Sequence, residues 1–121
     1  DLLELNHFVL KDVTFPYQLH IGAAENKLHV NVSGQNDQKA VVALSLYPLR
    51  RILKDYKIVC ESYLSALQDA DPSKVEAIDM GRRGLHDEGA DLVIELTESL
   101  VEMDHETARR FFSLIYVLHL R

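Results

Sequence analysis

The chain has 121 residues, of which 47% are hydrophobic and 26% are charged, and its formal net charge is −6 at pH 7. An acidic chain of this kind is a poor general binder of nucleic acid, which requires a basic surface. No apolar run is long enough to cross a bilayer, and the single cysteine, Cys60, excludes an internal disulfide. These features are typical of one cytoplasmic domain over residues 1–121.

The first third of the chain predicts three β-strands. Residues 1–5 are typical of the last turn of a helix that begins upstream, and an irregular segment follows them. Apolar residues then alternate with a period of two, which predicts strands over about 17–22 and 27–33. The segment between them, Gly22 to Asn26, is able to turn the chain. A third apolar run predicts a strand over about 40–46.

The rest of the chain predicts about four helices. Pro48 suits the first position of a helix, and Asp71 and Asp104 are typical N-terminal caps of later helices. Gly81 predicts the end of the helix that Asp71 caps, so that a separate helix follows it. The expected fold is therefore α+β, with a three-stranded antiparallel sheet packed on about four helices.

The final helix is apolar on nearly every side, because residues 111–120 read F-F-S-L-I-Y-V-L-H-L. A helix of this kind is either buried among several neighbours or packs one face against a second copy of the protein. Burial at the centre of the fold is the first interpretation. A homo-oligomer that forms through this helix is the second.

Six of the seven arginines occur in adjacent pairs, and each pair is expected in the first turns of a helix. Backbone N–H groups and the helix dipole favour anions there, and a guanidinium group binds phosphate or carboxylate through two hydrogen bonds. The candidate anion-binding residues are Arg50, Arg51, Lys54, Arg82, Arg83, Arg109 and Arg110. The alternative is a set of local ion pairs at four-residue spacing, namely Arg51–Asp55, Arg83–Asp87 and Glu106–Arg110.

A glycine-rich stretch, I-D-M-G-R-R-G-L-H-D-E-G over residues 78–89, holds the candidate catalytic residues. His86 and Glu88 are of residue types that act as general acids and bases. The stretch lacks the spacing of a phosphate-binding loop. Gly84 would let two backbones approach closely, and Gly89 indicates a local need for space within a helix. A capped turn between helices explains the same residues without catalysis.

Two histidines of the predicted hairpin are weak candidates for metal ligands. If Ile21 pairs with Leu28, His20 lies directly opposite His29 on the polar face of the sheet. No third ligand accompanies them, so a solvent-facing pair is the simpler interpretation. We therefore expect no metal and no other cofactor.

Four blocks of the sequence are distinctive: A-L-S-L-Y-P-L-R-R-I-L-K-D-Y (43–56), C-E-S-Y (60–63), V-E-A-I-D-M-G-R-R-G-L-H-D-E-G (75–89) and D-H-E-T-A-R-R-F-F-S-L-I-Y-V-L-H (104–119). In this order and spacing they resemble an uncharacterised bacterial protein family, known mainly from alphaproteobacteria. Asp87 stands where that family more often has asparagine, and Tyr116 where it often has cysteine. The resemblance implies a small cytoplasmic bacterial protein with a further N-terminal segment, and it assigns no activity.

These features favour a non-enzymatic cytoplasmic module that binds a small anion or a protein partner. The alternative is an enzyme acting on a phosphorylated or carboxylated metabolite. In that case Arg82 or Arg83 would clamp the substrate, and His86 or Glu88 would transfer a proton. Neither nucleic acid nor a membrane is an expected partner.

Overall fold

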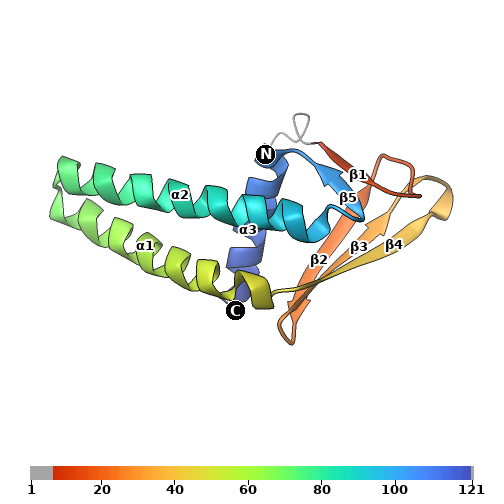
Figure 1. Cartoon of the computed structure of the whole chain (residues 1–121), viewed down its shortest axis with the longest axis horizontal. Helices are drawn as coiled ribbons and strands as arrows, with labels where there is room; N and C mark the ends of the chain where they lie inside the picture. Colours follow the sequence, from red (N-terminus) through yellow and green to blue (C-terminus); the bar gives the residue numbers. More distant parts are fainter. Residues whose placement is uncertain (1–6, 121) are drawn as a thin grey trace.

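A hairpin of two long helices extends from a three-stranded sheet, and a third helix crosses the hairpin near the sheet (Figure 1). This computed structural model describes residues 7–120, so the helical turn predicted at residues 1–5 lies outside the described residues. The elements are β1 (Phe8–Leu10), β2 (Gln18–Ala24), β3 (Lys27–Ser33), β4 (Lys39–Ser45), α1 (Arg50–Asp69), α2 (Pro72–Thr97), β5 (Val101–Met103) and α3 (His105–His119), with short 3-10 turns at Gln35–Asp37 and Tyr47–Leu49. The predicted α+β fold is confirmed.

The three predicted strands form an antiparallel sheet in the order β2-β3-β4. Their observed bounds differ from the predicted ones by at most two residues. Apolar side chains alternate as expected, since Leu28, Val30 and Val32 of β3 are all buried in the core.

The turn between β2 and β3 is shorter than the sequence predicts. Glu25 and Asn26 alone make it, with φ angles of 54° and 63°, which are the angles of a type I′ turn. Gly22 therefore continues the strand, and Ile21 pairs with Val30 rather than with the predicted Leu28. The shift is by two residues, so the same side chains still face the core.

α2 is one continuous helix, so the described chain has three α-helices rather than about four. The helix end predicted at Gly81 is wrong, because α2 packs lengthwise on α1 and buries part of Ile78 and Leu85 on either side of that glycine. This packing outweighs a helix penalty of about 1 kcal/mol for a glycine. The predicted caps are confirmed, since Asp71 accepts a hydrogen bond from Ser73 N–H at 3.1 Å.

α3 is buried along its inner face, as the first interpretation of its sequence expects. Phe112 and Ile115 are fully buried there, and the Phe112 ring meets Tyr56 of α1 edge-to-face at 5.3 Å. Asp104 caps this helix by accepting a hydrogen bond from Thr107 N–H at 3.0 Å. Leu114 faces outward and is about half exposed.

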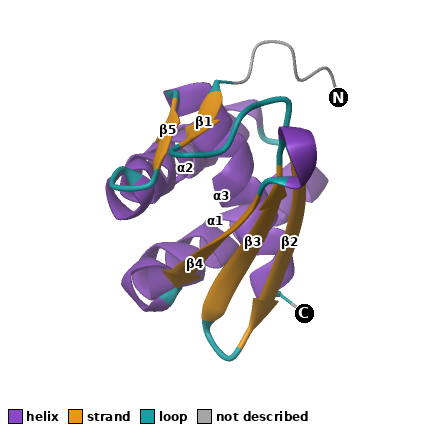
Figure 2. Ribbon diagram, turned by 90° about the vertical axis from the view of Figure 1, so that its right-hand side faces the viewer, coloured by secondary structure: helices purple, strands orange, loops and turns teal. Residues whose placement is uncertain are grey.

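β1 and β5 form a separate two-stranded antiparallel ribbon (Figure 2). Phe8 pairs with Met103 and Leu10 with Val101. The irregular structure predicted for this part of the N-terminal segment is therefore wrong. The pairing partner lies more than ninety residues away, so no local pattern indicates it.

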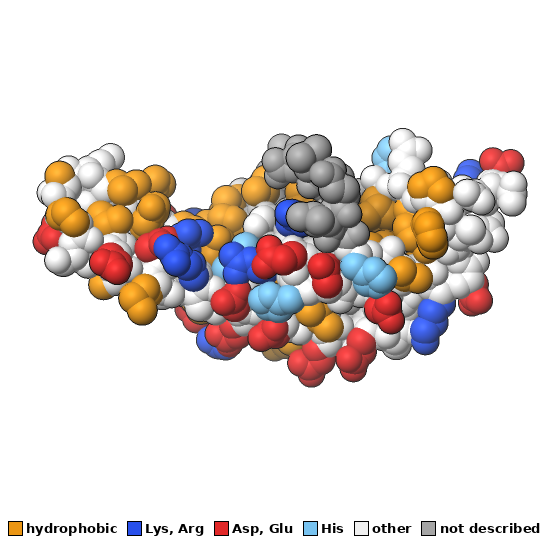
Figure 3. All heavy atoms as spheres, turned by 90° about the horizontal axis from the view of Figure 1, so that it is seen from above, with side chains coloured by type: hydrophobic (Ala, Val, Ile, Leu, Met, Phe, Trp, Pro, Cys, Tyr) orange, Lys and Arg blue, Asp and Glu red, His pale blue; other side chains and the backbone are white. Residues whose placement is uncertain are grey.

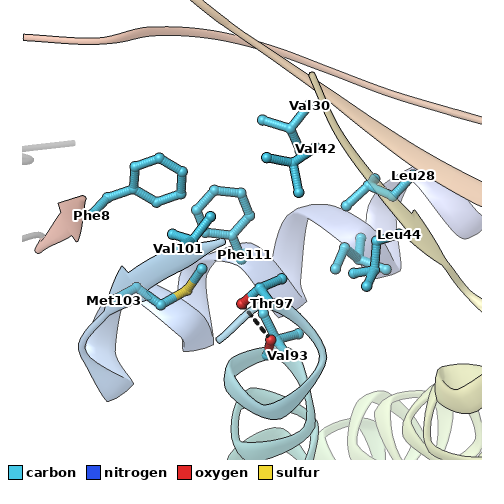
Figure 4. Close-up of a pocket in the computed structure, with 11 residues that line it drawn as sticks. Phe8, Leu28, Val30, Val42, Leu44, Val93, Thr97, Val101, Met103 and Phe111 are labelled. Carbon is cyan, nitrogen blue, oxygen red and sulfur yellow. Dashed lines mark hydrogen bonds between the residues drawn. The ribbon is translucent and has the colours of Figure 1, made fainter. Parts of the chain in front are cut away.

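A small cavity of about 20 Å³ lies where the sheet, the ribbon and the helices meet (Figure 4). Its lining is apolar apart from Thr97, whose hydroxyl donates a hydrogen bond to the Val93 carbonyl at 2.8 Å. A space this small and this apolar is a packing defect of the core rather than a binding site.

Candidate functional site

The first turns of α1 form one wall of a concave pocket of about 780 Å³. The opposite wall includes His119, the last residue of α3. The lining residues include no Asp or Glu, and they are Tyr47, Pro48, Arg50, Arg51, Leu53, Lys54, Lys57 and His119. We call this the basic pocket.

Three exposed cations give the basic pocket its charge. Arg50, Lys54 and Lys57 follow one another at spacings of four and three, which places them along one side of α1. Among residues 7–120, none of the three makes an ion pair with a carboxylate, although the Arg50 guanidinium lies over the Tyr47 ring at 5.6 Å. Arg50 lies in the first turn of α1, where its positive charge opposes the helix dipole, so an anion bound beside it would relieve an unfavourable arrangement.

Side chains, rather than the backbone, are the groups available to such an anion. Pro48 has no N–H, Leu49 N–H donates to the Leu46 carbonyl at 3.0 Å, and Arg50 N–H donates to the Tyr47 carbonyl. The expectation that free backbone N–H groups assist anion binding is therefore wrong for this helix.

Arg51 lies at the rim of the basic pocket and is already paired. Its guanidinium contacts Asp55 at 3.2 Å, which confirms the predicted four-residue pair, and Glu88 of α2 at 2.7 Å. Glu88, the second catalytic candidate, is thus engaged in a bridge between α1 and α2.

The second arginine pair lies in the middle of α2 and not in the first turns of a helix. Asp79 accepts hydrogen bonds from Arg82 at 2.6 and 2.9 Å and from Arg83 at 2.8 Å. These bonds, the one from Arg82 first, hold the pKa of Asp79 below its ordinary value. The predicted Arg83–Asp87 pair is therefore wrong, because Asp79 occupies Arg83.

The third pair lies at the start of α3, away from the basic pocket. Arg109 contacts Asp87 of α2 and lies 4.0 Å from Glu106. Arg110 is half-buried, and its predicted pairing with Glu106 stays a prediction. Only the first arginine pair lines the basic pocket, so the three pairs do not form a common anion site there.

His86, the first catalytic candidate, is a core side chain. It is 9% exposed, and its ring stacks on Tyr56 with the centroids 5.7 Å apart. Its Nε2 atom lies 3.0 Å from both the Arg109 carbonyl and the Ser113 hydroxyl, while its Nδ1 atom is buried without a partner. Burial, and next the charge of Arg109, lowers the pKa of His86. These contacts suit a neutral histidine that joins α2 to α3.

The two hairpin histidines do not face each other. His20 pairs with Asn31 and His29 with Gly22, because the short turn shifts the register by two residues. The predicted opposition of His20 and His29 is therefore wrong. Within residues 7–120, no group of three potential ligands is arranged to hold a metal ion.

Sequence reasoning missed three polar residues of the basic pocket. Lys57 was detectable, because it continues the helical spacing of Arg50 and Lys54. His119 and Tyr47 had no such signal, since α3 and the 3-10 turn reach this place only through the fold.

None of the helices within the described part of the chain combines the length and apolarity needed to span a membrane.

The model of an uncharacterised protein family, UPF0262, matches residues 1–121. A UPF0262 protein of Rhodospirillum rubrum is 49% identical over 122 residues, covering 100% of this chain and 76% of the relative. A UPF0262 protein of Methylobacterium radiotolerans is 45% identical, over 98% of this chain and 75% of the relative. One of Azorhizobium caulinodans is 49% identical, over 98% of this chain and 76% of the relative. No solved structure matches the chain. The resemblance drawn from the sequence blocks is thus confirmed, and the chain belongs to the UPF0262 family.

Proposed function

We propose that this protein is a non-enzymatic, cytoplasmic binding module that holds a small, multiply charged anion in the basic pocket. The observation that carries the proposal is the set of three cations, Arg50, Lys54 and Lys57, that face one concave surface without carboxylate partners among the described residues. The single cysteine, which allows no internal disulfide, supports the cytoplasmic assignment.

The size and charge of the pocket define the class of ligand. Its volume of about 780 Å³ lies in the range of small-molecule sites. If three charge-assisted hydrogen bonds contribute about 1.5–2 kcal/mol each, the Kd is on the order of 0.1 mM. Pyrophosphate, phosphorylated metabolites and tricarboxylates carry enough charge to engage all three cations.

The enzyme hypothesis has weaker support than the binding hypothesis. His86 lies in the core with its Nε2 atom bonded to α3, and Glu88 is paired with Arg51. Asp79 occupies both Arg82 and Arg83, the residues expected to clamp a substrate. None of these groups lines the basic pocket.

Isothermal titration with inorganic pyrophosphate at constant ionic strength tests the proposal. We expect saturable binding, weakened on the order of tenfold by Lys54→Ala or by Lys57→Ala. Lys74→Ala is the matched control, because Lys74 is exposed and pairs with Asp69 at 3.1 Å outside the pocket. Equal binding by all three variants, or no binding of pyrophosphate or citrate at about 10 mM, would remove the basis for the proposal.

A further inference from the structure

β2 is an edge strand without a charged side chain. Within the described chain only β3 pairs with it, so its other backbone edge has no partner strand. The strand reads Q-L-H-I-G-A-A, and the run without Asp, Glu, Lys or Arg extends back to Val13. Edge strands are usually protected by charges, prolines or bulges against pairing with another chain. β2 carries none of these within its seven residues.

An apolar groove of about 820 Å³ lies beside this strand, and residues of β1, β2 and α3 line it. Leu19 and Ile21 contribute from β2, and Leu114 contributes from α3. At the rim, Phe15 is 66% exposed, and Val117 is half exposed one turn further along α3. A largely apolar groove next to an open strand edge is typical of an interaction site.

We propose that a second copy of this chain binds here, with two β2 strands paired antiparallel about a twofold axis at Ile21. This register places Leu19 opposite the second copy's Ala23, and His20 opposite its Gly22. A larger side chain thus faces a smaller one, and no two charged groups face each other. The two sheets join into one sheet of six strands. Because α3 contacts β2, the axis also brings the exposed Leu114 of each copy toward the other.

The charge distribution favours a second copy at this place rather than at another face. Each chain carries a net charge of −6, and Figure 3 shows many acidic side chains on the face along which α2 lies. Two such faces repel each other, whereas the β2 edge and its groove bring no like charges together. A standard interface needs about 800 Å² from each partner, which is about a tenth of the 7973 Å² of accessible surface. The seven-residue strand β2, together with the adjoining face of α3, is expected to supply an area of this size.

Light scattering on the chain during size-exclusion chromatography, from about 1 to 200 μM, tests the proposal. We expect a mass that rises toward twice the 13.8 kDa of one chain. Phe15→Glu and Leu114→Glu change exposed side chains, so circular dichroism should remain unchanged while self-association weakens by about tenfold or more. Val41→Glu, on a residue of β4 that is 62% exposed, is the matched control and should leave the dimer intact.

Cross-linking tests the register itself. In a Cys60→Ser background, the Ile21→Cys thiols of two copies meet at the axis, and diamide should oxidise them to a disulfide-linked dimer. Ile58→Cys, on the exposed side of α1, should remain monomeric under the same treatment. A monomer at every concentration would overturn the proposal. So would a dimer that survives Phe15→Glu and Leu114→Glu, or one that cross-links through Ile58→Cys and not through Ile21→Cys.

Discussion

Replacing Gly89 by alanine tests the closest approach of α2 to α3. A Cβ atom at Gly89 would lie 2.4 Å from Cδ1 and Cε1 of Phe112 and 2.7 Å from its Cζ. Phe112 is fully buried, so its ring has no open space to move into. Gly84, five residues earlier in the same helix, offers the matched comparison, because a Cβ there would meet nothing within 4 Å. The close approach predicted for Gly84 is therefore wrong, whereas the local need for space predicted for Gly89 is confirmed by the Phe112 ring.

The two substitutions share one favourable effect and differ in one unfavourable effect. Alanine stabilises a helix interior by about 1 kcal/mol relative to glycine at either position. At Gly89 the overlap with a core ring should cost about 2–3 kcal/mol, the upper part of the range for overpacked cores. We therefore expect Gly84→Ala to raise the free energy of unfolding by about 1 kcal/mol and Gly89→Ala to lower it by about 1–2 kcal/mol.

Urea denaturation followed by circular dichroism measures both free energies. In thermal melts the two variants should differ in Tm by roughly 10 °C. A Gly89→Ala protein as stable as Gly84→Ala would show that α2 and α3 do not meet as described. The double variant Gly89→Ala/Phe112→Leu adds a check on the cause. Its loss of stability should be smaller than the sum of the two single losses, because the shorter side chain makes room for the methyl group.

Two further predictions concern polar groups of the helices. The buried His86 has a lowered pKa, so the unfolded chain takes up a proton near pH 6.5 before the folded chain does. The free energy of unfolding should therefore fall as the pH drops below about 6.5, and the His86→Gln variant should lose this part of the pH dependence in urea titrations. Asp104 caps α3, so Asp104→Ala should lower the free energy of unfolding by about 1 kcal/mol, whereas Asp104→Asn should lose much less. Equal losses in both variants would show that the charge of Asp104, and not its cap hydrogen bond, stabilises the helix, and an unchanged Asp104→Ala protein would show that the cap contributes nothing.

The elements that local chemistry specifies were predictable from the sequence. Alternating apolar residues located β2 and β3, and a continuous apolar run located β4. The capping aspartates Asp71 and Asp104 located the starts of α2 and α3. The β2–β3 turn was missed because Glu25 and Asn26 both adopt positive φ angles, and glutamate is an unusual residue for that conformation. Gly22, a more obvious turn residue, suggested a longer loop.

The contacts that were missed depend on tertiary packing. Gly81 remains helical because α1 supports α2 on both sides of it, which no local preference reveals. Arg50 and Lys54 of the basic pocket were identified as candidates from their residue types. His119, on the far wall of the pocket, could not be identified in this way, because α3 brings it there from the other end of the sequence. The sequence favours His86 as a catalytic candidate because the neighbouring residues do not indicate that this side chain is buried, as a structural role requires.

The ribbon formed by β1 and β5 joins segments that lie 95 residues apart, from Phe8 to Met103. Closing a free loop of that length costs about 4 kcal/mol of chain entropy, which three residue pairs offset poorly on their own. We therefore expect the ribbon to form only after the helices have brought its two strands together, late in folding rather than as a nucleus. We also expect it to be the first pairing to open when the helices loosen. The amide protons of Lys11 and Asp104, which donate to the Leu100 and His7 carbonyls across the ribbon, should then exchange with solvent sooner than those of β3.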